Sequence, residues 1–138
     1  MKNTFFLILI SLLQTVNFTQ AQSGSGEECR KQVLYEANTA GYYIYRIPAM
    51  VATPKGTLLA FCSARKGKGG DWDPIDIVLR RSTDSGKSWT PTQVIVHKDS
   101  LPCDNPMPII DYQTGEVHML YIYTLIKKQA RIVSLCTF

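Results

Sequence analysis

After residue 21 the sequence contains no long hydrophobic run and no sustained helical spacing of apolar residues. A membrane-spanning helix needs about 20 mainly apolar residues, and an amphipathic helix needs apolar side chains three and four positions apart. The chain beyond residue 21 therefore lacks the pattern of either helix. It also has no CxxC pair and no cluster of histidine with cysteine, which argues against a zinc site.

The sequence is also poor in clustered positive charge. Its formal net charge is +4, and the lysines and arginines are scattered apart from the short run at residues 65–68. A nucleic-acid-binding protein needs a denser basic stripe with stacking aromatic residues. A mild positive balance is equally compatible with a small anionic ligand, so charge excludes one class of partner without selecting another.

The first 21 residues have the features of a cleavable secretory signal. Lys2 precedes the apolar run of residues 5–10, and the small residues Thr19 and Ala21 stand at the −3 and −1 positions of the expected cleavage site. Polar residues such as Gln14 interrupt the run, which makes a membrane anchor the weaker interpretation. We therefore expect an exported protein, periplasmic or extracellular, with no membrane span after cleavage.

The exported part divides into a short lead-in and a folded region. We expect residues 22–41, which begin with small polar residues, to be flexible, and residues 42–138 to fold. An even number of cysteines in an exported chain permits two disulfides with three possible pairings. Cys62 lies within an apolar strand pattern, which favours a buried thiol instead. The four cysteines are Cys29, Cys62, Cys103 and Cys136.

Short apolar or alternating segments, punctuated by turn residues, indicate an all-β architecture. The expected strands are residues 42–45, 46–52, 57–62, 75–81, 93–97, 107–110 and 117–123. A glycine-rich loop spans residues 66–74, while residues 126–138 show neither a turn nor a closing strand. A sandwich or a barrel would have the same strand spacing, so a more specific sequence motif is needed to choose among all-β folds.

One such signal is the Asp-box motif, Ser-x-Asp-x-Gly-x-Thr-Trp, which residues 82–89 match with Ser88 in place of threonine. The motif describes a hairpin turn. Gly86 can adopt a left-handed conformation, Asp84 can accept backbone amides across the turn, and Trp89 can pack beneath it. Its role is therefore structural rather than catalytic. Asp-boxes occur in sialidases but also in other carbohydrate-active folds, so the motif alone is not specific.

A second motif, Tyr-Arg-Ile-Pro at residues 45–48, resembles the element that opens the first blade of sialidases. In that family its arginine, here Arg46, is one of three that bind the carboxylate of sialic acid. A guanidinium offers a planar fork that matches a carboxylate and stays charged at every working pH. The alternative is an ordinary surface arginine beside a proline. Residues 58–82 make this alternative less favoured.

Residues 58–82 resemble the sialidase pattern of a strand ending in an arginine, a loop carrying an aspartate, and a strand entering the Asp-box. Arg65 matches the arginine that holds the sugar near its 4-hydroxyl. Asp71 matches the loop aspartate that acts as general acid and base. It lies 25 residues after Arg46, which is the interval between the corresponding residues in sialidases. Asp73 is the competing candidate, whereas Asp76 alternates within a strand and is expected to be structural.

A general acid must hold a proton near the leaving oxygen of the substrate. The loop that carries Asp71 can be assessed against this requirement. The segment Gly67-Lys68-Gly69-Gly70 would give a flexible approach over a bound sugar, with Trp72 shielding Asp71 from water. Partial burial would keep Asp71 protonated, and Lys66 and Lys68 would oppose this if they lay close. A simple mobile connection is the alternative.

A third stretch, residues 104–111, resembles the Asn-Pro-x-Pro segment that leads a second-blade strand in sialidases. It makes Asn105 a candidate for substrate binding. A turn asparagine before a proline explains the same residue equally well.

Together these stretches imply a six-bladed β-propeller, of which this chain would supply an N-terminal fragment of one to one and a half blades. They imply an exo-α-sialidase that hydrolyses terminal sialic acid from glycoproteins, glycolipids and oligosaccharides with retention, through a tyrosine nucleophile outside this chain. No metal or organic cofactor is implied. We expect the fragment alone to be inactive and marginally folded, because unclosed blades expose strand edges.

Three alternatives remain: a non-catalytic carbohydrate-binding propeller with Asp-boxes, an inactive remnant of a sialidase, and a small two-disulfide secreted protein with a chance Asp-box.

Overall fold

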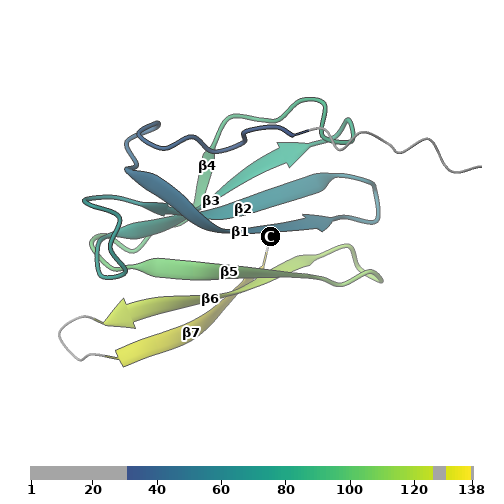
Figure 1. The fold of residues 1–138 in the computed structure, drawn as a ribbon. Coiled ribbons are helices and arrows are strands. Elements are labelled where there is room, and N and C mark those ends of the chain that lie inside the picture. Colours follow the sequence, from purple (N-terminus) through teal and green to yellow (C-terminus); the bar gives the residue numbers. More distant parts are fainter. Residues whose placement is uncertain (1–30, 126–129, 138) are drawn as a thin grey trace, which may run out of the picture. The chain divides into compact units, whose positions relative to one another are not determined.

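The computed structural model describes residues 31–125 and 130–137, and the compact unit considered below begins at Gln32. The predicted secretory signal, Cys29 and the first part of the predicted lead-in lie outside the described residues. The described segments consist of strands, turns and bends (Figure 1), which confirms the predicted all-β class. None of them forms a helix long and apolar enough to cross a membrane.

The first sheet contains four antiparallel strands in the order of the chain. They are β1 (Ile44–Ala52), β2 (Leu58–Arg65), β3 (Ile75–Ser82) and β4 (Gln93–Val96). Each is joined to the next by a turn or loop, so the sheet is a simple meander (Figure 1). The two strands predicted at residues 42–45 and 46–52 form one strand with an irregularity in its middle.

The second sheet contains three antiparallel strands, β5 (Cys103–Ile110), β6 (Val117–Leu125) and β7 (Ala130–Thr137). The expectation that the tail has no strand is wrong, because β7 pairs with β6 along eight residue positions, from His118↔Thr137 to Leu125↔Ala130. The physical reason is visible in the register, which places Val133 beside Ile122 and Leu135 beside Leu120 on one face of the sheet. The chain thus supplies one four-stranded sheet and three strands of another.

The two sheets pack against each other through alternate residues of their strands. Side chains alternate between the faces of a strand, so one face of each sheet contributes to a shared apolar core. From the first sheet the core takes Leu59, Phe61, Ile77, Leu79 and Val96, and from the second it takes Cys103, Val117, Met119 and Tyr121.

β1 and β5 share an unusual local feature near their beginnings. In β1 the register shifts between Arg46 and Ala49, and Ile47 has a φ of 53°. In β5 the register shifts between Asp104 and Met107, and Asn105 has a φ of 58°. In both strands the left-handed residue precedes a proline, which cannot donate a ladder hydrogen bond. Bulges of this kind re-aim neighbouring side chains, and here those neighbours are Arg46 and Asp104.

The segment before β1 is held against the first sheet. Tyr35 stacks on Tyr45 with ring centroids 5.2 Å apart, and its hydroxyl donates to the carbonyl of Ala60 at 2.7 Å. Arg80 lies over the Tyr35 ring at 5.4 Å. The described part of the predicted lead-in therefore covers one face of β2 and β3.

The turn between β3 and β4 has the geometry that the Asp-box predicts. Asp84 accepts hydrogen bonds from the amide and hydroxyl of Ser88 at 2.9 and 2.6 Å and from the hydroxyl of Ser82 at 2.7 Å. Gly86 has a φ of 84°, and the indole of half-buried Trp89 donates to its carbonyl at 3.2 Å. Hydrogen bonds, chiefly from Ser88, hold the pKa of Asp84 well below its usual range. These contacts support the structural role expected for Asp84.

Candidate functional site

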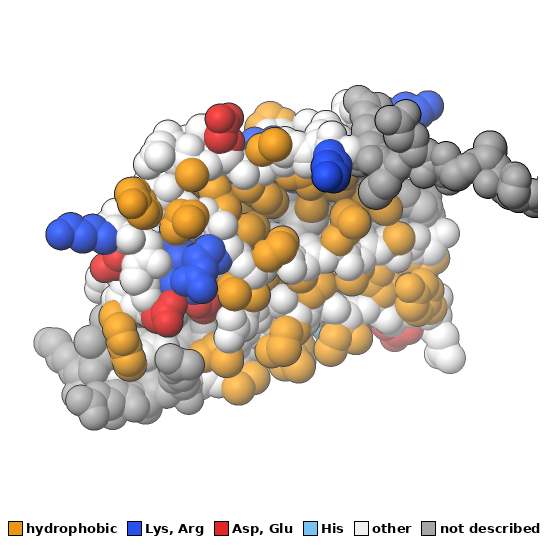
Figure 2. Space-filling model, in the orientation of Figure 1, with side chains coloured by type: hydrophobic (Ala, Val, Ile, Leu, Met, Phe, Trp, Pro, Cys, Tyr) orange, Lys and Arg blue, Asp and Glu red, His pale blue; other side chains and the backbone are white. Residues whose placement is uncertain are grey.

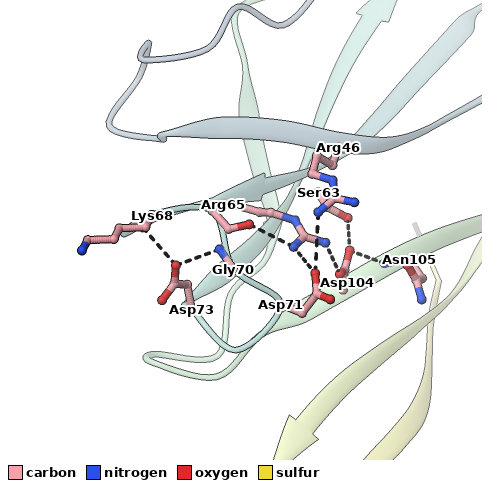
Figure 3. Close-up of polar contacts among 10 residues, drawn as sticks. Arg46, Ser63, Arg65, Lys68, Gly70, Asp71, Asp73, Asp104 and Asn105 are labelled. Atoms are coloured by element: carbon pink, nitrogen blue, oxygen red, sulfur yellow. Dashed lines mark hydrogen bonds and ion pairs between the residues drawn. The ribbon is translucent and has the colours of Figure 1, made fainter.

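The two bulges border a hollow of about 170 Å³. It is lined by Arg46 and Ile47 of β1, Arg65 at the end of β2, Asp71 of the 66–74 loop, Pro102, Asp104 and Asn105 around the start of β5, and Ile122 and Thr124 of β6. Residues from four separate stretches of the sequence meet here, and the close-up shows residues from the first three (Figure 3). The structure thus brings together the predicted residues Arg46, Arg65, Asp71 and Asn105.

Arg65 is the fixed centre of this hollow. Its side chain is 2% exposed, and its Nη2 donates to Oδ2 of Asp104 at 2.7 Å. Its Nη1 donates to Oδ1 of Asp71 at 2.5 Å and to the carbonyl of Gly69 at 3.2 Å (Figure 3). A buried guanidinium is tolerated only when it is paired, so Asp104 and Asp71 compensate the charge that β2 carries into the interior.

Asp104 is the site residue that sequence reasoning did not single out. Besides Arg65, its carboxylate accepts the hydroxyl of Ser63 at 2.6 Å and the amide of Asn105 at 2.8 Å. Its neighbour Asn105 lines the hollow as well. The sequence offers only an acidic residue before an Asn-Pro pair. Its partner, Arg65, lies 39 positions away along the chain, a distance across which spacing carries no signal.

Arg46 is the exposed cation of the hollow. Its side chain is 49% exposed, and its Nη1 lies 3.7 Å from Oδ1 of Asp71. It reaches this position because the bulge at Ile47 turns the strand directly after it. Arg46 and Arg65 therefore present two guanidinium groups to one carboxylate, one buried and one open to solvent.

Asp71 lies on a loop that is pinned rather than loose. The carboxylate of Asp73 accepts the amides of Lys68 at 3.0 Å and Gly70 at 2.9 Å (Figure 3). At the base of the loop, the amide of Lys66 donates to the carbonyl of Pro74 at 3.0 Å. Asp73, the competing candidate, is thus directed at the loop backbone, whereas Asp71 is directed at the arginines.

The loop glycines serve close packing and left-handed turns. A β-carbon on Gly69, whose φ is 80°, would lie 2.8 Å from a methyl carbon of Ile44. One on Gly67 would lie 2.9 Å from the Asp73 carboxylate. These glycines let the loop fold tightly onto β1 and around Asp73, and the predicted flexibility of the loop stays a prediction.

The side chain of Asp71 is 59% exposed, which differs from the partial burial expected to keep it protonated. Trp72 is itself 52% exposed. Adjacent guanidinium groups favour the ionised form of a carboxyl group. Asp71 therefore lies beside two cations and open to solvent, not in the buried setting that would keep a carboxyl group protonated.

Asp76 has the buried position expected of a structural residue. It is 2% exposed and accepts hydrogen bonds from the Tyr42 hydroxyl at 2.7 Å, His97 Nδ1 at 2.7 Å and Lys66 Nζ at 3.0 Å. Burial alone would raise the pKa of this carboxyl group, but the hydrogen bonds from His97, Tyr42 and Lys66 outweigh it and lower the pKa.

The described cysteines are free thiols. Cys62 and Cys103 are buried, which confirms the expectation for Cys62, and Cys136 is half-buried. Desolvation raises the pKa of both Cys62 and Cys103 to about 11. Among the residues that the structure describes, no three acidic, histidine or cysteine side chains gather as a metal site would require.

Comparison with known proteins finds sialidases among the relatives of this chain. No family model matches the chain. A sialidase from Micromonospora viridifaciens is 34% identical over 88 residues, covering 61% of this chain and 14% of that protein. An exo-alpha-sialidase from Aspergillus fumigatus is 32% identical over 77 residues, covering 51% of this chain and 19% of that protein. The chain thus spans less than a fifth of the length of these two relatives.

Solved structures agree on the fold. The Hadza microbial sialidase Hz136 matches with a TM-score of 0.62 and 21% identity, over 71% of this chain and 24% of that one. The NanB sialidase from Streptococcus pneumoniae matches with a TM-score of 0.63 and 18% identity, over 67% and 18%. The sequence relatives are sialidases, which this chain resembles over part of its length, and the solved structures show that it forms part of a sialidase-like β-propeller.

Proposed function

We propose that this chain supplies the first part of the active site of an exo-α-sialidase that hydrolyses terminal sialic acid from glycoproteins, glycolipids and oligosaccharides with retention. The observation that carries the proposal is the convergence of Arg46, Arg65 and Asp71 on one small hollow. A pair of guanidinium groups beside a solvent-exposed carboxyl group suits an anionic sugar that must be both held and protonated.

In this proposal Arg46 binds the carboxylate of the sugar. Its guanidinium is half-exposed and borders the hollow, so a ligand can reach it without displacing a buried group. A bidentate arginine–carboxylate pair gives orientation as well as attraction. A lysine at this position would keep the charge but lose the planar fork.

Asp71 acts as the general acid and base. Two neighbouring arginines favour its ionised form. When a sugar carboxylate binds at Arg46, its negative charge offsets that cation and disfavours a second negative charge nearby. Substrate binding therefore favours the protonated form of Asp71, which is the form that donates a proton to the leaving oxygen.

The Arg65–Asp104 pair forms a rigid wall of the site. Arg65 is buried and Asp104 is held by Ser63, so neither moves far when a ligand enters. Such a pair offers a donor and an acceptor to a sugar hydroxyl, and the resemblance to sialidases points to the 4-hydroxyl. Asn105, whose backbone bonds the same carboxylate, adds an amide at the rim.

Two parts of the proposal, the nucleophile and the export of the protein, do not rest on the residues of the hollow. No tyrosine is among the described residues that line the hollow, and the proposed tyrosine nucleophile belongs to a part of the enzyme beyond this chain. Export to the periplasm or the extracellular space, proposed from the first 21 residues, would place the site where sialylated glycans are met.

Ligand binding by the isotope-labelled chain tests the proposal. Titration with N-acetylneuraminic acid is expected to shift the NMR signals of Arg46, Arg65, Asp71 and Asn105, with an affinity in the millimolar range because much of the site is contributed elsewhere. Arg46→Lys should weaken binding about tenfold, whereas the control Arg81→Lys, at an exposed position on β3, should not change it. An equal response to a neutral hexose would contradict the proposal.

A further inference from the structure

A second polar cluster lies beside the candidate site and is not explained by it. It consists of Asp76 with Tyr42, Lys66 and His97, and is called the Asp76 cluster below. Asp76 is in register with Ala64, and Ile75 is in register with Arg65. Because side chains alternate between the faces of a sheet, Asp76 lies on the opposite face of the first sheet from Arg65.

The Asp76 cluster joins three segments that are distant in sequence. Tyr42 precedes β1, Lys66 begins the loop after β2, and His97 follows β4. Asp76 also bears on the buried thiol of Cys103, at the start of β5, whose pKa its charge helps to raise. A 2%-exposed carboxylate with three hydrogen-bond donors is a satisfied, fixed charge.

Lys66 connects this cluster to the loop that carries Asp71. Its amide donates to the carbonyl of Pro74, and its carbonyl accepts the amide of Gly69 at 3.1 Å, so its backbone closes the loop. Its ammonium group is held by Asp76 at 3.0 Å and lies 5.6 Å from the centre of the Tyr42 ring. Side chain and backbone of one residue thus tie the loop to the buried carboxylate.

Holding Lys66 has an electrostatic consequence. Its ammonium group sits on a flexible four-carbon stem only five residues before Asp71. A released lysine this close in sequence would compete with Arg46 and Arg65 for the Asp71 carboxylate. An additional cation there would favour the ionised form of Asp71 and hinder proton donation.

We propose that Asp76 is a positioning residue, which anchors the 66–74 loop through Lys66 and keeps the ammonium group of Lys66 away from Asp71. The anchoring concerns the structure of the chain, whereas its effect on proton donation rests on the proposed sialidase function. Asp76 itself is not among the residues that border the hollow.

Amide hydrogen exchange of the full chain, measured without sugar, tests the anchoring. Lys66→Met and Asp76→Asn should each speed exchange at the amides of Gly69 and Gly70 about tenfold, since each removes a charge-assisted bond. Tyr42→Phe leaves the lysine contact in place and should change those amides less than about twofold. The control Asp111→Asn, in the turn after β5, should leave them unchanged.

Unchanged loop exchange in Lys66→Met would overturn the proposal, and this variant keeps the test decisive if Asp76→Asn fails to fold. Because no sugar is present, the result is independent of sialic acid binding.

The electrostatic role has its own readout in the native protein that carries this chain. Asp76→Asn should shift the pH profile of sialoside turnover towards lower pH, since the released lysine favours ionised Asp71. Adding Lys66→Met to Asp76→Asn should restore the profile, because the released cation is then gone. A purely structural role for Asp76 predicts lower turnover with an unshifted profile and no rescue, and that outcome would contradict the electrostatic role.

Discussion

At the scale of single residues, the site is organised around the buried charge of Arg65. Asp104 and Asp71 each pair with one terminal nitrogen of its guanidinium, and the Nε atom has no hydrogen-bond partner among the described residues. A buried cation that loses its partner is strongly destabilising. Ser63 contributes by fixing the second oxygen of Asp104.

Removal of Asp104 should therefore lower the free energy of unfolding. Asp104→Ala leaves the Arg65 guanidinium buried with only Asp71 and a backbone carbonyl, and we expect a loss of about 3 kcal/mol. Urea denaturation followed by circular dichroism measures it. The control Glu36→Ala, at an exposed position, should change stability by less than about 0.5 kcal/mol. Equal effects of the two substitutions would contradict the assigned pairing.

The thiols provide a second residue-scale prediction. Cys62 and Cys103 are buried with pKa values raised to about 11, so little thiolate is present at pH 8. Alkylation at pH 8, resolved by mass spectrometry, should modify half-buried Cys136 at least about tenfold faster than either. Rapid modification of Cys62 in the folded chain would contradict the structure.

Residue-scale prediction from sequence worked where a motif marked the residue. Arg46, Arg65 and Asp71 were found through the order and spacing of short patterns, and they do meet at one hollow. Asp104 was not found, because its role arises from a contact between the two sheets. The anchoring of Lys66 was not found either, since it depends on which face of the sheet Asp76 occupies.

At the scale of elements, the same local bulge occurs in two strands. β1 and β5 each carry a bulge with a left-handed residue before a proline, and each bulge presents a charged side chain to the hollow. The sequence shows these prolines but does not predict the bulges, because isoleucine, the residue at position 47, rarely adopts a left-handed backbone conformation. β7 was missed since its apolar residues find their neighbours only across β6.

The Asp-box turn offers an element-scale test. Gly86→Ala has room for the added methyl group but places it on a backbone with φ of 84°, so we expect a loss of about 1 kcal/mol. The matched change Ser85→Gly relaxes a non-glycine residue at φ of 58° and should be neutral or stabilising. Thermal unfolding distinguishes the two, and equal melting temperatures would contradict the turn geometry.

At the scale of the whole molecule, the two packed sheets leave an apolar surface uncovered among the described residues. Register places six apolar side chains on the face of the second sheet that is turned away from the first. Met107, Ile109, Val133 and Leu135 are exposed, whereas Leu120 and Ile122 are half-buried. Figure 2 shows hydrophobic side chains along the strands on the side turned to the viewer. Such surface agrees with a sheet that belongs to a larger propeller.

Stability should depend on pH in two windows of opposite sign. Asp76, Asp84 and Asp111 have lowered pKa values, so their contribution is present above the usual value of 3.8 and is lost as pH falls below it. Cys62 and Cys103 have pKa values raised from 9.0 to about 11, so their contribution is lost as pH rises between those values. Midpoints of urea unfolding, measured from pH 3 to 11, should be nearly constant between the acidic and the alkaline window and should fall within each. A midpoint that rises as the pH is lowered below 3.8 would contradict this expectation.

The central claim, that Asp71 rather than Asp73 is the acid of a sialidase site, is tested most directly by turnover of a fluorogenic sialoside. In the native protein that carries this chain, Asp71→Asn should lower kcat by about 100- to 10,000-fold, because the proton donor is lost. Asp73→Asn retains an oxygen that can accept the loop amides and should lower kcat less than about tenfold. A large loss in Asp73→Asn with near-normal turnover in Asp71→Asn would contradict the assignment, and absence of turnover in the unaltered protein would contradict the enzymatic function itself.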